Sequence, residues 1–324
     1  MTKKIRCDIM NKEAEFNDYF SCMDEDIMRK NKISVRKLMR NPAAVFIALL
    51  VIAVFFIYEQ WFSGPNYAAI PDGHIAVHFV DVGQGDATIV QTPNGKNMLI
   101  DTGTPDSRDT LCQYIRSLGI KSFDYLVLTH PHDDHIGGAL RILDEFEVNA
   151  VIMPDANHTS YTYEKLLNGI IEKNIPVKKA VSGDEYKLDA ATFTVLAPND
   201  TTYASLNNYS VVLRLVFGRN SFLFCGDAET LSENEMLKRF SPSELQSDIL
   251  KLGHHGSSTS SSKKFLDAVC PAVAIVSAGE NNDYGHPHPA VIKRLENAGV
   301  SIYRTYSDGT IVLWSDGNTV TRMS

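Results

Sequence analysis

The sequence has few cysteines, five among 324 residues. Cys112, Cys225 and Cys270 follow residue 60, and three is an odd number whose spacing fits no disulfide framework. This argues against a disulfide-stabilised scaffold, and we interpret all three as buried thiols. A repeat with a period of roughly 20–50 residues is also lacking, which excludes a solenoid or propeller.

An excess of positive charge is absent too. The 31 basic and 39 acidic side chains give a net charge of −8. Residues 1–41 carry 10 basic and 7 acidic groups, so residues 42–324 carry 21 and 32 and have a charge of −11. No stripe of aromatic and basic side chains is obvious. The balance argues against a large non-specific nucleic-acid surface, although a local basic groove is compatible with it.

Phosphate-binding fingerprints are missing as well. The Gly-rich stretch DVGQGDA has neither the Lys-Ser/Thr ending of a P-loop nor the spacing of a dinucleotide-binding loop. Its glycines suit a tight turn between strands. Gln84 and Asp86 in this stretch either brace a neighbouring site or serve only the fold.

One long apolar run is present. Residues 42–58, PAAVFIALLVIAVFFIY, contain no charge, and a basic segment precedes them. The run has the length of a membrane span, and its positive flank favours a cytoplasmic N-terminus. A cleaved signal peptide and a buried core helix are the alternatives. We therefore predict a single-pass protein of the cell membrane, with a cytoplasmic segment (1–41), an uncleaved transmembrane anchor (42–58), a linker (59–72) and an extracytoplasmic domain (73–324).

From residue 75 onward, short β-rich runs alternate with amphipathic stretches. Strand-like runs outnumber helix-like stretches by about two to one, and the helices separate groups of strands in both halves. We predict one α/β domain in which two sheets pack face to face with helices outside. The helix-like stretches are 107–117, 135–146, 161–173, 228–240, 261–269 and 289–298.

Three of the ten histidines lie in HPHDDHIGG, directly after a strand-like run. In an extended segment His130 and His132 point to the same side, and Asp134 and His135 fall at the first turn of the helix that follows. Imidazole and carboxylate groups together suit zinc, manganese or iron, and four of them so close can hold two ions. The alternative, a capped helix start with surface histidines, makes the clustering a coincidence.

Further polar groups follow other strand-like runs. Asp227 ends FLFCGD, His254 and His255 lie in LKLGHHG, and His286 lies in DYGHPHP. Loops after strands commonly present functional groups. A single aspartate at a strand end is more often a turn residue, so it is the occurrence together with the first cluster that makes these residues site candidates.

These motifs resemble a known family. HPHDDH resembles the H-x-H-x-D-H signature of the metallo-β-lactamase-fold hydrolases. FVDVGQGDA, LIDTG, NNYSVVL, FCGD, LKLGHHGS and YGHPHP are together similar to the extracellular nuclease-like domain of the ComEC family of DNA-uptake proteins. The resemblance covers about residues 75–315. It implies a four-layer αββα sandwich in residues 73–324, preceded by the transmembrane helix.

The resemblance also implies a centre with two divalent ions, zinc or manganese. One ion takes the first two histidines of the signature, the second takes its final aspartate and histidine, and Asp227 bridges both. A histidine of the pair at 254–255 completes the second site; we favour His255, with His254 near the substrate phosphate. Asp101 in LIDTG would orient the ligands from below. The implied metal ligands are His130, His132, Asp134, His135, Asp227 and His255.

One feature departs from the wider superfamily. Many members have a further histidine ligand before a GSVVL-like strand, where this chain has Asn207 and Asn208. The ComEC-like subgroup shares this departure, which leaves the first ion with fewer ligands. Either an asparagine contacts metal or substrate, or both belong to a turn. The run GSSTSSSKK offers the Ser257 hydroxyl and two lysines to phosphate oxygens, or else it is a loop with a helix cap.

Two bridged ions lower the pKa of a shared water, so we predict direct hydrolysis with Asp134 and Asp227 in catalytic roles. His254 and His286 are candidates to protonate the leaving group. The leading hypothesis is a membrane-anchored, extracytoplasmic phosphodiesterase or nuclease that acts on single-stranded DNA or a smaller phosphodiester. The alternatives are an amide or lactam hydrolase on the same metals, and a non-catalytic scaffold of a DNA-uptake or envelope complex. Protein partners stay open.

Overall fold

The computed structural model describes residues 42–62 and 70–323. The predicted cytoplasmic segment (1–41) lies outside the described residues, as do residues 63–69 of the predicted linker. The contacts within the chain divide it into two units, residues 1–66 and 67–324.

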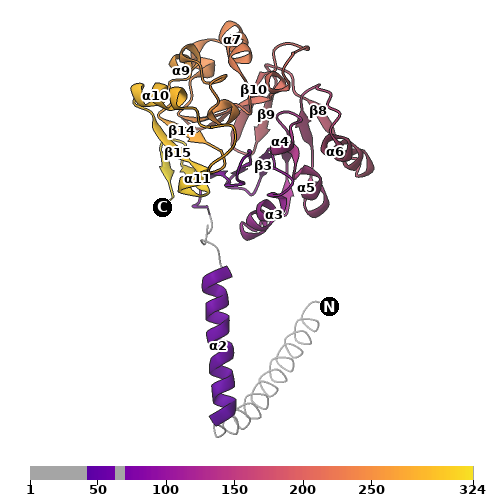
Figure 1. Ribbon diagram of the computed structural model, residues 1–324, viewed down its shortest axis with the longest axis vertical. Helices are drawn as coiled ribbons and strands as arrows, with labels where there is room; N and C mark the ends of the chain where they lie inside the picture. The colour runs from indigo at the N-terminus through magenta and orange to yellow at the C-terminus, as the bar shows by residue number, and fades with distance from the viewer. Residues whose placement is uncertain (1–41, 63–69, 324) are drawn as a thin grey trace, which may run out of the picture. The chain divides into compact units, whose positions relative to one another are not determined.

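In the first unit, the apolar run forms helix α2 (Pro42–Phe62), which is drawn in indigo in Figure 1. Crossing a bilayer requires both sufficient length and sufficient hydropathy. Among the residues described here, no helix has both. The predicted single-pass membrane location, with a cytoplasmic N-terminus and an extracytoplasmic domain, is therefore wrong.

The second unit is built on two large β-sheets. The strands of the first sheet are β1 (Ile75–Phe79), β2 (Thr88–Gln91), β3 (Asn97–Ile100), β5 (Tyr125–Val127), β7 (Val151–Met153), β8 (Val177–Lys179), β16 (Ile311–Ser315) and β17 (Val320–Arg322). Those of the second are β9 (Glu185–Leu188), β10 (Ala191–Ala197), β11 (Val212–Phe217), β12 (Asn220–Phe224), β13 (Ile249–Lys251), β14 (Val273–Val276) and β15 (Ser301–Arg304). Their orders are β17-β16-β1-β2-β3-β5-β7-β8 and β15-β14-β13-β12-β11-β10-β9. The short strands β4 (Ser122–Phe123) and β6 (Glu147–Val148) pair separately.

An apolar core fills the space between the two sheets. Because side chains alternate along a strand, Val77 and Phe79 of β1 face this core. The Phe79 and Phe224 rings lie 6.1 Å apart across it. Burying one such large side chain stabilises the fold by about 1.5–3 kcal/mol, so the core holds the two halves of the unit together.

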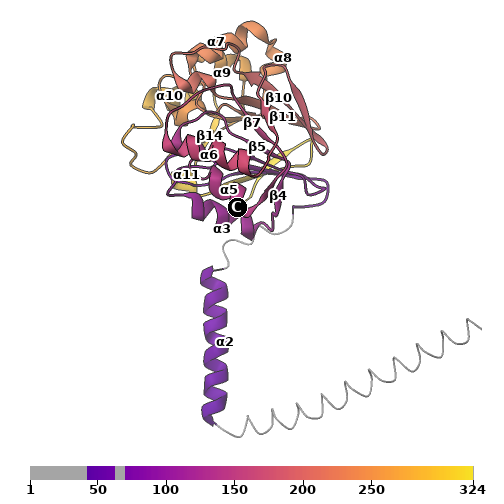
Figure 2. The same cartoon turned by 90° about the vertical axis from the view of Figure 1, so that its right-hand side faces the viewer.

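Helices cover the outer faces of both sheets, which gives four layers (Figures 1 and 2). Separate apolar clusters fill the two helix–sheet interfaces, with Leu111 and Ile142 in one and Met236 and Leu295 in the other. The helices are α3 (Arg108–Ser117), α5 (Ala139–Glu145) and α6 (Tyr161–Glu172) on the first sheet, and α7 (Thr230–Arg239), α9 (Lys263–Val269) and α10 (Pro289–Asn297) on the second. The short elements are α4 (Asp133–Ile136), α8 (Pro242–Leu245), α11 (Thr305–Asp308) and the 3-10 turns η1 (Leu206–Tyr209) and η2 (Gly253–Gly256). The predicted α/β fold of two sheets with outer helices is confirmed.

The cysteines differ from the prediction at one position. Cys112 and Cys225 are buried, as predicted, and each is a free thiol. Cys270 is exposed instead. It ends α9 in a left-handed conformation (φ 48°), where the chain turns away from the apolar interface.

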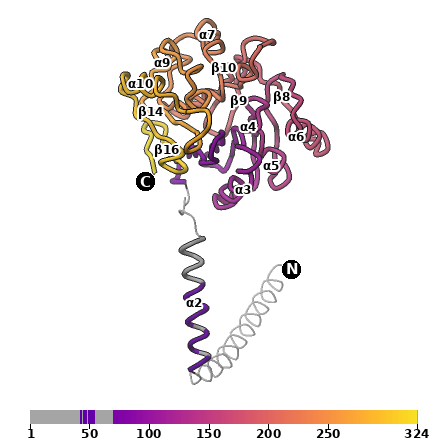
Figure 3. The backbone as a smooth tube through the Cα atoms, viewed as in Figure 1, coloured from indigo at the N-terminus to yellow at the C-terminus, as the bar shows by residue number. Residues whose placement is uncertain are grey.

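Parallel pairing brings several strand ends to one edge of the unit. β3 pairs in parallel with β5, and β13 pairs in parallel with both β12 and β14. The loops that leave their carboxyl ends begin with Asp101, Leu128, Cys225, Leu252 and Ser277. The tube view shows the purple-to-magenta first half and the orange-to-yellow second half of the unit (Figure 3). This edge carries the predicted site residues.

Candidate metal centre

The histidine-rich segment begins just after β5. His132 has an extended backbone (φ −80°, ψ 148°) and occupies the N-cap position of α4. Its Nδ1 lies 2.9 Å from Nε2 of His130, so the two rings point to the same side, as the period of two requires. The first turn of α4 adds Asp134 and His135, whose Oδ1 and Nε2 atoms are 4.0 Å apart. The four groups of the motif converge on one spot.

Asp227 joins this cluster from the second sheet. Its Oδ1 lies 3.2 Å from His135 Nε2 and 3.6 Å from His255 Nε2. Its Oδ2 lies 3.8 Å from His130 Nε2. The preceding Gly226 has φ 50°, and a Cβ there would lie 2.9 Å from Thr129 Cβ, so glycine lets the β12 loop approach the β5 loop. The carboxylate therefore lies between ligand candidates from both sheets.

A strained turn presents the histidine pair. His254 (φ 50°) and His255 (φ 53°) both adopt left-handed backbone conformations, which cost about 1–3 kcal/mol each and tend to occur at functional sites. Hydrogen bonds from His254 N to Gly226 O (3.0 Å) and from Ser257 N to His254 O (2.7 Å) hold the turn. His255 is buried, and its Nδ1 donates to Ser277 O (2.9 Å). Its Nε2 is thereby directed at Asp134 Oδ2, 3.3 Å away.

Asp101 lies beneath the cluster, 1% exposed. Its carboxylate accepts hydrogen bonds from Thr129 N (2.8 Å), Thr129 Oγ1 (2.7 Å) and His135 Nδ1 (2.8 Å). The last bond keeps the His135 proton on Nδ1 and leaves Nε2 as a lone-pair donor. The hydrogen bond fixes the orientation of the His135 ring, and the role of Asp101 behind a metal ligand stays a prediction.

The centre fits a divalent metal ion. Within the described part of the chain, His135 Nε2, His255 Nε2 and Asp227 Oδ1 are buried and have no hydrogen-bond partner. A buried polar atom without a hydrogen bond destabilises the folded state by about 1–3 kcal/mol. These three atoms lie close together, so one bound group could contact all of them. A mixed set of imidazole nitrogens and carboxylate oxygens suits zinc, manganese or iron. A bound ion would satisfy all three atoms.

Three of the four groups of candidate ligand atoms in the described residues include His135. One group is His130, His135 and Asp227, another is Asp134, His135 and His255, and the ligand atoms of each lie within 4.8 Å of one another. His132 belongs to no such group among the described residues, although its ring touches His130. The assignment of ligands to individual ions stays a prediction.

Charge in the centre is balanced by protons when no metal is bound. The neighbouring His135 and His255 outweigh burial and hold the pKa of Asp227 well below its usual value. Burial lowers the pKa of His255, but Asp227 and Asp86 outweigh it and raise that pKa to about 10. Since metal ligation requires neutral imidazole, protons and metal compete for the same atoms.

Other predicted residues lie at the rim. The His286 ring is 5.3 Å from that of His254, and burial lowers the pKa of His286 to about 4. Asn207 Nδ2 lies 3.4 Å from Nε2 of His254. Asn208 donates to Glu229 (2.9 Å), which indicates a turn role for Asn208.

The serine-rich run is largely structural. Ser257 Oγ shares a hydrogen bond with Thr259 (3.1 Å), and Ser262 caps α9. Lys263 forms an ion pair with Asp267 on the exposed face of α9 (2.7 Å), so its ammonium group already has a partner. These contacts favour the loop-and-cap alternative over phosphate binding by this run.

Two features escaped the sequence analysis. Lys251, 2% exposed, forms an ion pair with Asp86 and donates to Gly226 O (3.4 Å) below the centre. The signal was a lysine inside the apolar run DILKLG. His158 follows β7, its ring lies 6.1 Å from that of His132, and its Nδ1 is buried without a hydrogen-bond partner among the described residues. Like the recognised histidines, it follows a strand-like run.

Comparison with known proteins agrees with this geometry. The metallo-beta-lactamase superfamily matches residues 80–280, and the chain belongs to this family of metal-dependent hydrolases. ComE operon protein 3 of Bacillus subtilis (strain 168) is 34% identical over 72% of this chain and 32% of its own length. Competence protein ComA of Neisseria gonorrhoeae is 32% identical over 82% and 35%. The chain thus spans about a third of the length of these relatives, and the predicted resemblance is confirmed.

Solved structures share the fold. The metallo hydrolase Igni18 of the archaeon Ignicoccus hospitalis KIN4/I superposes with a TM-score of 0.52, covering 73% of this chain and 98% of that chain. The two sequences are 18% identical, so this likeness concerns the fold alone.

Proposed function

We propose that the chain is a metal-dependent phosphodiester hydrolase. One observation carries the proposal: His135 Nε2, His255 Nε2 and Asp227 Oδ1 converge, buried and without other partners in the described residues. Clustered buried polar groups cost stability unless something occupies the space between them. A scaffold has no need of such a cluster, whereas a hydrolase does.

We propose two ions, zinc or manganese. The residues that would hold them are His130, His132, Asp134, His135, Asp227 and His255. When bound, divalent ions acidify water and stabilise charge on the group under attack. Asp227 lies at the middle of the cluster, where its carboxylate would accept a hydrogen bond from the attacking water and orient it. His254 Nε2, 3.7 Å from Asp227 Oδ2 and with 23% of the side chain exposed, is open to substrate and would donate a proton to the leaving oxygen.

A phosphodiester fits better than an amide or lactam. At the position where many superfamily members have a further histidine ligand, Asn207 offers an amide N–H beside the His254 ring. Two N–H donors at the open side suit the anionic oxygens of a phosphate. The relatives named above include a competence protein, and we propose single-stranded DNA as a substrate beside smaller phosphodiesters.

The test is hydrolysis by the purified full chain of bis-(p-nitrophenyl) phosphate and of single-stranded DNA, with manganese or zinc, beside Asp134→Ala. We expect metal-dependent cleavage that the variant loses. Lys263→Ala, on the exposed face of α9, is the matched control and should cleave like the wild type. Metal binding without cleavage of either substrate would favour an amide hydrolase, and a folded chain that binds no metal would favour the scaffold.

A further inference from the structure

A row of aromatic rings leads away from the metal centre. The loop between β14 and α10 carries Tyr284, which is 71% exposed. Its ring stacks on His286, with centroids 5.7 Å apart and planes 20° apart. The His286 ring is 5.3 Å from that of His254, which in turn contacts Asp227. Three rings therefore connect the reacting centre with an open aromatic face.

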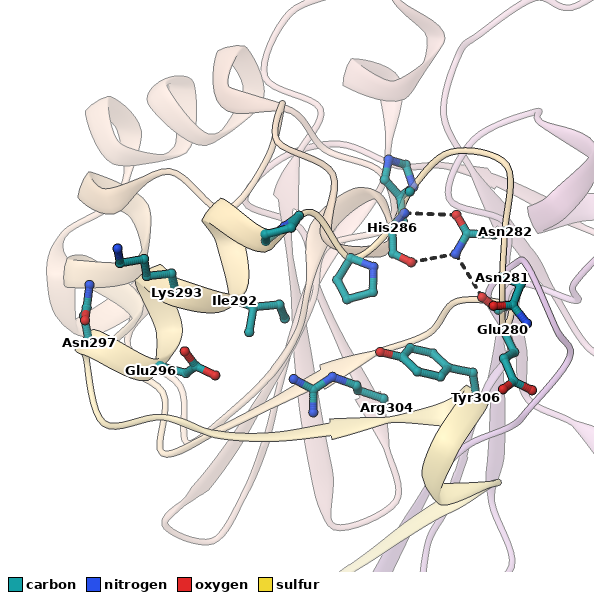
Figure 4. A pocket seen from close by; sticks show the side chains of 14 residues that line it. Glu280, Asn281, Asn282, His286, Ile292, Lys293, Glu296, Asn297, Arg304 and Tyr306 are labelled. Carbon is teal, nitrogen blue, oxygen red and sulfur yellow. Dashed lines mark hydrogen bonds between the residues drawn. The ribbon is translucent and has the colours of Figure 1, made fainter.

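The loop that carries Tyr284 is held by one side chain. Asn282 Nδ2 donates to Gly279 O (2.9 Å) and His286 O (2.6 Å), and its Oδ1 accepts from His286 N (3.0 Å) (Figure 4). These bonds close the loop on itself and fix its tip. An aromatic face fixed in this way loses little entropy when a ligand stacks on it.

A groove of about 850 Å³ lies on the other side of the same loop. Figure 4 shows the His286 ring pointing away from this groove and Arg304 and Tyr306 extending into it. Two cations, Arg304 and Lys293, line the groove, and neither has an ion pair among the described residues. Glu280 and Glu296 also line it, so the groove has no net positive charge.

We infer that Tyr284 is a stacking subsite for a nucleobase next to the scissile phosphate, with the groove as the path of the adjoining strand. The ligand is a single-stranded polynucleotide, and the inference rests on the proposed function. Every nucleobase has a π face, so the subsite tolerates any sequence. One stacked base improves affinity by roughly 5- to 150-fold.

The same geometry predicts a shallow salt dependence. Two cations allow at most two phosphate contacts, so log Kd should rise with log salt concentration with a slope of about 0.7–1.4. Stacking, rather than charge, then supplies most of the affinity. This matches a chain whose net charge is −8.

The experiment compares the binding of two fluorescent oligomers to the full chain in excess EDTA, where cleavage is blocked. One is a short oligothymidine and the other is an abasic oligomer of equal length and charge. We expect the wild type to prefer the oligothymidine by roughly 5- to 150-fold, and Tyr284→Ala to lose this preference. Tyr284→Phe should keep it, because the phenyl ring still stacks.

Tyr161→Ala is the matched control. Tyr161 is 69% exposed, nearly as much as Tyr284, but it lies on α6 under Lys165. This variant should bind both oligomers like the wild type.

The inference is overturned if the wild type binds both oligomers equally, or if Tyr284→Ala keeps the preference. Either result leaves the proposed function standing, since hydrolysis of bis-(p-nitrophenyl) phosphate is measured separately. If the wild type prefers the oligothymidine but hydrolyses neither substrate, the proposed function is wrong and the stacking subsite at Tyr284 still stands.

Discussion

Replacing Asp101 by asparagine should weaken metal binding without unfolding the chain. Asp101 has φ 58°, a left-handed conformation that asparagine also tolerates, and the two side chains have nearly the same shape. The amide oxygen can still accept from Thr129 N. The amide nitrogen then faces His135 Nδ1, which must become an acceptor, and the imidazole proton moves to Nε2. That atom is the one directed at Asp227.

The size of the effect follows from this tautomer change. Losing a hydrogen-bonded carboxylate behind a ligating histidine typically costs about 10- to 100-fold in metal affinity. This corresponds to about 1.4–2.7 kcal/mol. Unfolding free energy should change less, because Thr129 keeps a partner.

The assay is a competitive chelator titration of zinc and manganese, with circular dichroism to verify folding. Nitrogen NMR of the histidines would detect the proton on His135 Nε2. Asp124→Asn is the matched control, since Asp124 also accepts a backbone N–H, from Asn97 (3.0 Å), but lies away from the centre. A folded Asp101→Asn variant with wild-type metal affinity would refute the reasoning.

Other predictions concern stability. Lys251→Met removes the ammonium partner of the buried Asp86, which keeps His255 Nδ1 at 3.3 Å. The free energy of unfolding, measured with denaturant, should fall by about 3–5 kcal/mol, and adding Asp86→Asn should restore part of it. Burial lowers the pKa of His78 to about 4, so the unfolded chain binds a proton that the folded chain refuses. The free energy of unfolding should therefore fall by about 3 kcal/mol as the pH drops from about 6.5 to about 4. His78→Gln should remove this loss, and an unchanged pH profile would contradict it. Gly137→Ala places a Cβ 2.3 Å from Pro105 N, so melting temperature should fall markedly; a wild-type value would show that the loop yields.

The sequence carries much of the fold because its patterns are local. Alternating apolar runs such as those of β1 and β10 predict strands, and the amphipathic stretches that became α6 and α10 predict helices. The signature in HPHDDHIGG is local too: side chains two residues apart in an extended segment point to the same side, so the sequence alone places His130 beside His132. Asp227 and His255 could be added only because they follow strand-like runs, as the first cluster does, and because their motifs resemble those of a known family.

Features that depend on distant partners were not predictable. Lys251 and Asp86 are 165 residues apart, and nothing local indicates that a lysine in an apolar run will be buried against an aspartate. The proximity of the exposed Tyr284 ring to the groove was not visible, because Tyr284 lies in the loop after β14 and Arg304 of the groove ends β15. The apolar run at 42–58 predicts helix α2 correctly, but its apolar character alone did not establish a membrane span.

The most direct measurement is the metal content of the purified full chain after incubation with zinc or manganese and removal of free ions. It should be compared with Asp227→Ala and with the surface variant Lys263→Ala. The account predicts about two ions per chain in the wild type and in Lys263→Ala, with a clear loss in Asp227→Ala. A folded wild type that retains no metal would contradict the assignment of the buried, partnerless atoms as metal ligands.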